Sequence, residues 1–187
     1  MYLSTPRIAP LADDELDADQ RAALEAAGSK LNIIRTLARA PKALTRFLEW
    51  GSYILSKRNA LPAREREIVI LRTGFLCKSG YEFTQHTRIG LACGLTEAEI
   101  AAIKIGADAK TWNDADRALI QACDELHARQ FISDAAWAAL MRSFDQKQCM
   151  DVVFTAGQYT QVSMMLNTFG VQLDPGQTLD PDLKAQA

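Results

Sequence analysis

The chain has 187 residues, an apolar fraction of 48%, a charged fraction of 24% and a formal net charge of −2. This length suits one domain with a sizeable core, because domains commonly contain about 100 to 200 residues. The near-neutral charge gives no basic surface for nucleic acid, and no run reaches the roughly 20 apolar residues of a membrane span, so we expect a cytoplasmic protein that binds neither nucleic acid nor a membrane.

Nearly every segment has the spacing of an α-helix, and no strand-like alternation is sustained. Pro41 and Pro62 suit the first turn of a helix, the box from Thr96 to Glu99 caps another that Gly106 ends, and Gly28 ends a further one. The sequence therefore predicts an all-α fold. Besides a helix that carries residues 82 and 86, the expected helices cover residues 18–27, 32–39, 41–57, 62–76, 96–105, 113 onward, 133–143 and 146–169.

Two terminal segments differ in composition from the rest of the chain. We expect residues 1–14 to form an N-terminal arm, residues 15–174 the helical domain, and residues 175–187, rich in Asp, Pro and Gly, a loosely ordered tail. The helix expected over residues 146–169 carries more apolar surface than one face of a monomer should expose, which predicts a homo-oligomer.

The candidate active site lies where proton-handling side chains gather. Glu82 and His86 are four residues apart, so they share one helix face, and Ser79 falls within about 20° of His86 on the same helix. A short turn at Lys78 and Ser79 would fold the preceding helix back and bring Glu67 toward them. His86 is then the acid/base group and Glu82 its partner, because an imidazole exchanges protons near neutral pH and a carboxylate orients it.

A structural alternative exists for the same residues. Ser79 and Glu82 have the Ser-x-x-Glu spacing of a capping box, in which each side chain bonds the other's backbone N–H. That alternative explains the spacing of Ser79 and Glu82 but leaves His86 without a role.

Three further residues are candidates for substrate binding or for a purely structural place. Arg72 could hold a substrate carboxylate bidentately. It is preferred to Arg88, which points about 160° away from His86; an ion pair is the alternative for both. Tyr159 is a candidate because a buried hydroxyl needs a partner, although core packing explains it equally.

The cysteines and the second histidine give little sign of a metal or redox site. The four cysteines are widely spaced and are expected to be reduced. His127 suits a helix C-terminus, and with only two histidines, 41 positions apart, no metal site is expected. Cys77 is the thiol nearest the candidate site and keeps a redox role open.

The segment from Arg64 to Ile100 resembles the signature of the carboxymuconolactone decarboxylase superfamily, which includes an alkylhydroperoxidase branch. The segment from Val153 to Asp174 resembles the C-terminal helix of its longer members. The resemblance implies an alkylhydroperoxidase D-like helical bundle that forms trimers or hexamers, with an arm-exchanged dimer as the alternative. The peroxidase branch carries Cys-x-x-Cys-x-x-x-His and a glutamate twelve residues earlier; here Glu67 and His86 match, while Ser79 and Glu82 replace the cysteines.

The resemblance also implies an activity. We expect a lyase, of the decarboxylase or isomerase type, that acts on a small carboxylated or lactone-type acid in aromatic-compound degradation and needs no metal or organic cofactor. The alternatives are a thiol peroxidase or redox protein that uses Cys77, and a helical oligomer whose site has lost its activity.

Overall fold

Helices account for all the regular structure of the described part of the chain. The computed structural model describes residues 1–184, and within that range it contains no strand. Short 3₁₀ helices lie at Asp13–Glu15 and Pro181–Leu183. The α-helices are α1 (Ala18–Ala27), α2 (Asn32–Leu37), α3 (Pro41–Leu55), α4 (Ala63–Leu76), α5 (Gly80–Ala92), α6 (Glu97–Ile105), α7 (Asp114–Arg129), α8 (Asp134–Met141) and α9 (Gln146–Phe169).

The helix ends follow the local chemistry of the sequence. Thr96 accepts a hydrogen bond from the Glu99 N–H at 3.2 Å, and the Glu99 carboxylate accepts from the Thr96 N–H at 2.8 Å, so the predicted capping box of α6 is confirmed. Gly28 ends α1 with φ of 60°, a left-handed conformation that glycine adopts without strain. The predicted helices are confirmed, with α2, α3 and α8 each ending two residues early.

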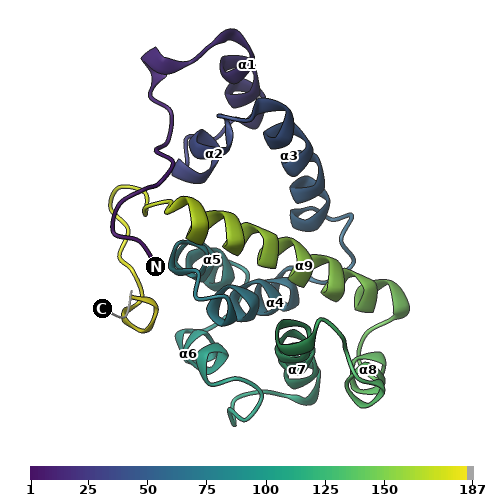
Figure 1. Ribbon diagram of the computed structural model, residues 1–187. Coiled ribbons are helices and arrows are strands. Elements are labelled where there is room, and N and C mark those ends of the chain that lie inside the picture. The colour runs from purple at the N-terminus through teal and green to yellow at the C-terminus, as the bar shows by residue number, and fades with distance from the viewer. Residues whose placement is uncertain (185–187) are drawn as a thin grey trace.

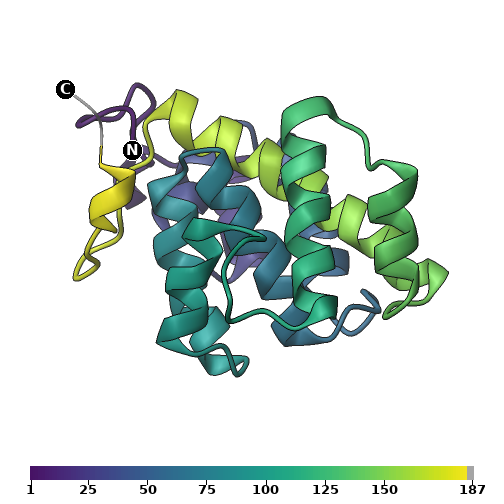
Figure 2. The ribbon, with the colours of Figure 1, turned by 90° about the horizontal axis from the view of Figure 1, so that it is seen from below.

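Helix α9 divides the molecule into two layers. Figure 1 shows α1, α2 and α3 on one side of α9 and α4 to α8 on the other, and Figure 2 gives the perpendicular view. On the second side α4 is central: Ile68, Val69, Ile70 and Leu71 are all 0% exposed. An α4 buried on every face is therefore the scaffold on which α5, α7 and α9 are positioned.

The layer of α1 to α3 is joined to the rest by a smaller core and by two buried or half-buried carboxylates. Asp174, just after α9, accepts from the first backbone N–H of α2, that of Asn32, at 2.8 Å. Asp151, fully buried on α9, accepts from the Tyr53 hydroxyl at 2.7 Å and from the Ala60 N–H at 2.6 Å. The layer is thus attached to α9 and the segment after it at the start of α2 and at the end of α3.

The C-terminal segment packs against the helical domain. Leu183 is 2% exposed, and Lys104 of α6 donates to the carboxylates of Asp180 at 3.1 Å and Asp182 at 2.6 Å. The expectation of a loosely ordered tail is wrong for residues 175–184, because apolar contacts and ion pairs offset the effect of its composition. The last three residues of that predicted tail lie outside the described residues. None of the helices in residues 1–184 combines the length and apolar character that a membrane span requires.

Candidate active site

The chain brings an imidazole, two carboxylates and a phenol together where α4, α5 and α9 meet. The turn between α4 and α5 is short, with Lys78 at a positive φ of 55°, so the two helices run back against each other. They approach closely at Gly74, where an added Cβ would lie 3.2 Å from Glu82 Cγ. Glycine at this position therefore leaves room for the Glu82 side chain beside α4.

His86 is the centre of this cluster. Its Nδ1 lies 2.7 Å from Glu67 Oε2, and its Nε2 lies 3.2 Å from the Tyr159 hydroxyl. Glu82 Oε1 is 3.0 Å from Nε2 but makes no hydrogen bond there, so this contact is an ion pair. The rings of His86 and Tyr159 meet edge to face, 4.9 Å apart. Both nitrogens of the imidazole therefore have a partner, and the predicted meeting of Glu67, Glu82 and His86 is observed.

The electrostatics favour a protonated His86. Burial by itself lowers the pKa of the imidazole, but the charge of Glu82 and the hydrogen bond and charge of Glu67 outweigh it and raise the pKa of His86 to about 10. For Tyr159, burial and the same two carboxylates raise the pKa well above its ordinary value. At neutral pH the cluster consists of an imidazolium and a neutral phenol, both of which can donate a proton or a hydrogen bond.

His86 faces a cavity of about 520 Å³ between α5, α9 and the layer of α1 to α3. Its walls are largely apolar, and most of its polar groups come from α5 and α9, a composition that suits a small-molecule site. The residues that line it include Leu31, Ile34, Phe47, Gly51, Ile54, Leu55, Tyr81, Glu82, Gln85, His86, Arg88, Gln158, Tyr159 and Val162.

Ser79 does not form the capping box that its spacing allowed. It occupies the N-cap position of α5, but its side chain accepts no capping hydrogen bond. Its hydroxyl is fully buried and has no partner among residues 1–184, and it does not line the cavity. Two helical turns separate it from His86, about 10 Å along the axis, so sharing a face did not bring the two together.

Arg72 also lies away from this cavity. Its Nε donates to Asp124 at 2.6 Å, and its Nη1 donates to the Ile103 carbonyl at 2.7 Å near the end of α6. The structural alternative, an ion pair, therefore describes Arg72, and Arg88, which the sequence argument had ranked lower, lies at the cavity instead. Helical angles from His86 placed Arg88 on another face, but the cavity is wide enough to extend round α5.

Gln85 and Gln158 are the cavity residues that sequence reasoning missed. Gln85 directly precedes His86, and its amide donates to Asp174 at 2.7 Å; Gln158 directly precedes Tyr159 and is 5% exposed. Uncharged amides on apolar helices give no pattern of their own. Their position next to two candidate residues was the one available signal.

The thiols are separate from this cluster. The four cysteines are free. Cys77 Sγ lies 3.8 Å from His127 Nδ1, and burial raises the pKa of the Cys77 thiol. Within residues 1–184 no three His, Cys, Asp or Glu side chains are placed to hold a metal ion.

Comparison with known proteins identifies a family match and a shared fold. Residues 41–124, which contain Glu67, Glu82 and His86, match the model of the carboxymuconolactone decarboxylase family. A comparison with curated proteins finds no match.

Several solved structures share the fold. An uncharacterized peroxidase-related protein from Ralstonia eutropha, described as an alkylhydroperoxidase AhpD core, is 19% identical with a TM-score of 0.75 over 90% of this chain and 93% of that chain. A peroxidase-related protein from a Silicibacter species is 15% identical with a TM-score of 0.71 over 92% and 91%. A variant of the debrominase Bmp8 in complex with 2,3,4-tribromopyrrole is 12% identical with a TM-score of 0.73 over 92% and 94%.

Sequence identities this low establish a shared fold but not a shared activity, which depends on the residues at each site. In this chain the two positions of the peroxidase cysteine pair hold Ser79 and Glu82, whereas the glutamate and histidine of the signature are present as Glu67 and His86. Residues 41–124 therefore match the carboxymuconolactone decarboxylase family, and the chain as a whole has the alkylhydroperoxidase D-like fold and lacks a Cys-x-x-Cys pair.

Proposed function

We propose that the protein is a cofactor-free lyase, of the decarboxylase or isomerase type, that acts on a small carboxylated or lactone-type acid. One observation carries this proposal: a buried imidazolium lies between two carboxylates beside a largely apolar cavity. A general acid of this kind is typically worth a factor of about 10² to 10⁴ in rate.

A decarboxylation of this kind needs a general acid, because the carbon that loses carbon dioxide must be protonated. Breaking the bond to the carboxylate releases carbon dioxide and leaves its electron pair on carbon, delocalised into a conjugated carbonyl. His86 then gives its proton to that carbon and is reprotonated from water. Glu67, bonded to Nδ1, fixes the ring, which leaves the Nε2 side, beside Glu82 and Tyr159, to face the substrate.

An isomerisation would use the same groups. Glu82 would remove a proton from one carbon and His86 would supply one to another, so the double bond moves without loss of carbon. The apolar walls suit an uncharged ring, and Arg88 at the cavity is the cation within reach of a substrate carboxylate.

A thiol peroxidase is the second candidate, since Cys77 lies near an imidazole, that of His127, and two proteins of this fold are described as peroxidase-related. Against it, burial raises the pKa of the Cys77 thiol, and a thiolate is the reactive form. The third candidate is an oligomeric protein without catalytic activity.

A screen of unsaturated lactone acids and aromatic-degradation intermediates tests the proposal, with release of carbon dioxide or loss of ultraviolet absorbance as the signal. His86→Ala and Glu82→Gln should each lower turnover by about 10² to 10⁴-fold. His127→Ala is the matched control, because it removes the other histidine and should leave turnover unchanged.

The double variant His86→Ala/Glu82→Gln should cost little more than the worse single variant, because groups that act as one unit are non-additive. Full turnover in His86→Ala would exclude the proposed acid. Peroxide reduction that depends on Cys77 would favour the second candidate.

We also propose that the protein is a homo-oligomer, a trimer or hexamer with a dimer as the alternative. Met150, Val153 and Met164 are 37 to 62% exposed and lie within about 60° of one another round α9. Sedimentation at micromolar concentration should show a species several times larger than 20.7 kDa. Met164→Glu should reduce its size, and a monomer of the wild-type protein would contradict the proposal.

A further inference from the structure

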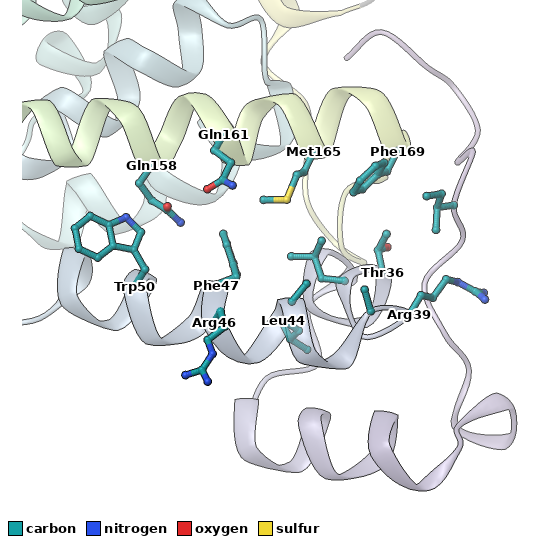
Figure 3. A pocket seen from close by; sticks show the side chains of 14 residues that line it. Thr36, Arg39, Leu44, Arg46, Phe47, Trp50, Gln158, Gln161, Met165 and Phe169 are labelled. Atoms are coloured by element: carbon teal, nitrogen blue, oxygen red, sulfur yellow. The ribbon is translucent and has the colours of Figure 1, made fainter.

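A second cavity lies between α3 and α9, on the other side of Phe47 from the His86 cavity. Its volume is about 570 Å³, within the range of sites that hold a small organic molecule. Figure 3 shows its walls, with Gln158, Gln161, Met165 and Phe169 extending from α9 toward the side chains of α3. The residues that line it are Ile8, Thr36, Leu37, Arg39, Ala40, Ala43, Leu44, Arg46, Phe47, Trp50, Gln158, Gln161, Met165 and Phe169.

The two cavities are neighbours that share a wall. Phe47 of α3 and Gln158 of α9 line both of them. Gln158 directly precedes Tyr159, whose hydroxyl lies 3.2 Å from His86 Nε2. A molecule that reacts at His86 therefore needs to extend only past Phe47 and Gln158 to enter the second cavity.

The charged groups of the second cavity are engaged elsewhere. Arg39 donates through Nε to the Ala9 carbonyl at 2.9 Å, and Arg46 pairs with Glu49 at 2.8 Å. No Asp or Glu lines this cavity. Since the interior walls are aliphatic, aromatic or amide groups, they suit an uncharged apolar occupant, and a second carboxylate would lose its hydration without a partner.

Thr36 lines this cavity and has a hydroxyl that is unpartnered within the described residues. Thr36 is 3% exposed, and its hydroxyl has no hydrogen-bond partner in residues 1–184. This hydroxyl oxygen is itself buried, so it offers no accessible hydrogen-bonding group to an occupant, and the wall at Thr36 is apolar toward the cavity.

We propose that the second cavity holds an uncharged apolar substituent of the substrate, whose lactone or acid end lies in the His86 cavity. The identity of the reacting end rests on the proposed function, while binding of the substituent does not. The substrate class is then a lactone or unsaturated acid that carries an alkyl or aryl group, longer than the lactone ring alone.

A homologous series of γ-lactones, from γ-valerolactone to γ-decalactone, tests this without any turnover. Trp50 lines the second cavity, so its fluorescence reports on occupancy, and Trp50→Phe identifies its share of the signal. Each added methylene should tighten binding by about three- to four-fold in the wild-type protein, as expected for a buried CH₂ group.

Two substitutions on α3 distinguish binding in the second cavity from binding in the His86 cavity. Ala43 lines only the second cavity and Gly51 only the His86 cavity, so Ala43→Phe and Gly51→Phe each fill one of them. Ala43→Phe should abolish the gain with chain length and leave γ-valerolactone unaffected, whereas Gly51→Phe should weaken every lactone. Gln161→Trp narrows the second cavity from α9 and should repeat the result of Ala43→Phe, which guards against a folding defect.

Each outcome decides the inference. Equal chain-length dependence in the wild-type, Ala43→Phe and Gln161→Trp proteins would overturn it. So would a flat series in the wild-type protein, or a change in oligomer size on Ala43→Phe, which would mean that a second copy of the chain covers the cavity. Chain-length-dependent binding lost in both variants supports it even if no lactone acid is turned over, in which case only the proposed function fails.

Discussion

The two sides of α9 differ in how tightly they are packed. On the side of α4, four successive residues, Ile68 to Leu71, are completely buried. On the side of α3, only Leu44 and Ile54 of that helix are buried, and two cavities lie against it. The acid/base groups are held by α4, α5 and α9, whereas α3 contributes the cavity walls. The proposed acid/base groups and the α3 walls of the cavities therefore come from different parts of the chain, one tightly packed and one loosely packed.

The largest effect on stability should come from raising the pH through the pKa of His86, which lies on the tightly packed side. His86 holds its proton more tightly in the folded protein, with a pKa of about 10. Its contribution to stability is therefore fully present below about pH 6.5, the ordinary pKa of histidine, and is lost as the pH rises toward 10. The free energy of unfolding, measured in urea, should fall by on the order of a few kcal/mol across this range.

The histidine variants show whether His86 is responsible. His86→Gln should remove most of the fall between pH 6.5 and 10, whereas His127→Gln should retain it. A fall of equal size in both variants would assign it to other groups and weaken the case for an imidazolium.

Cavity-creating substitutions compare the packing of the two sides directly. Leu119 of α7 is 0% exposed and lies in the large core, whereas Leu48 of α3 is half-buried beside the His86 cavity. Leu119→Ala should lower the free energy of unfolding by about 2 to 5 kcal/mol, and Leu48→Ala by about 1 kcal/mol, because its site already borders open space. Equal losses in urea denaturation would mean that the cavity beside α3 is filled in solution.

A smaller effect is expected at the phenol that joins α9 to the site. Tyr159→Phe keeps the ring contact with His86 and removes the hydroxyl 3.2 Å from Nε2. One such hydrogen bond is worth about 1 kcal/mol, so turnover should fall about five- to ten-fold. Tyr53→Phe, which removes a hydroxyl bonded to Asp151 away from the site, should change stability and leave turnover unaltered.

The smallest effect is expected at the thiol. Cys77→Ser should leave turnover of a lactone acid within a few-fold of the wild-type value, because this side chain lies beside His127 and does not line the His86 cavity. A loss beyond ten-fold would place Cys77 in the reaction.

Most of the fold could be predicted because it depends on local chemistry. Thr96, Ser133 and Asn113 each accept a hydrogen bond from the first turn of the helix that follows, and Gly28 and Gly106 end helices where expected. The terminal segment escaped prediction, since the burial of Leu183 depends on a surface formed by residues far away in sequence.

Only those contacts of the site that lie within one helix could be predicted from the sequence. Glu82 and His86 are one turn apart on one helix, so their contact follows from spacing. Arg72 follows Glu67 by five residues and so points about 140° away round α4, which by itself separates it from the site. The approach of Tyr159 and Gln158 depends on how α9 rotates against α5, and no local pattern encodes that rotation.

Asp174 and Asp151 give the α3 layer an unusual mechanical property. One carboxylate fixes the start of α2, and the other fixes the end of α3 and the loop after it. Helix α3, fifteen residues and about 22 Å long, makes up most of the chain between Asn32 and Ala60, where these attachments are made. A layer fixed at both ends cannot swing open as a hinged lid does, so any widening of the two cavities would come from bending of α3 in its middle, where Phe47, Leu48 and Gly51 lie.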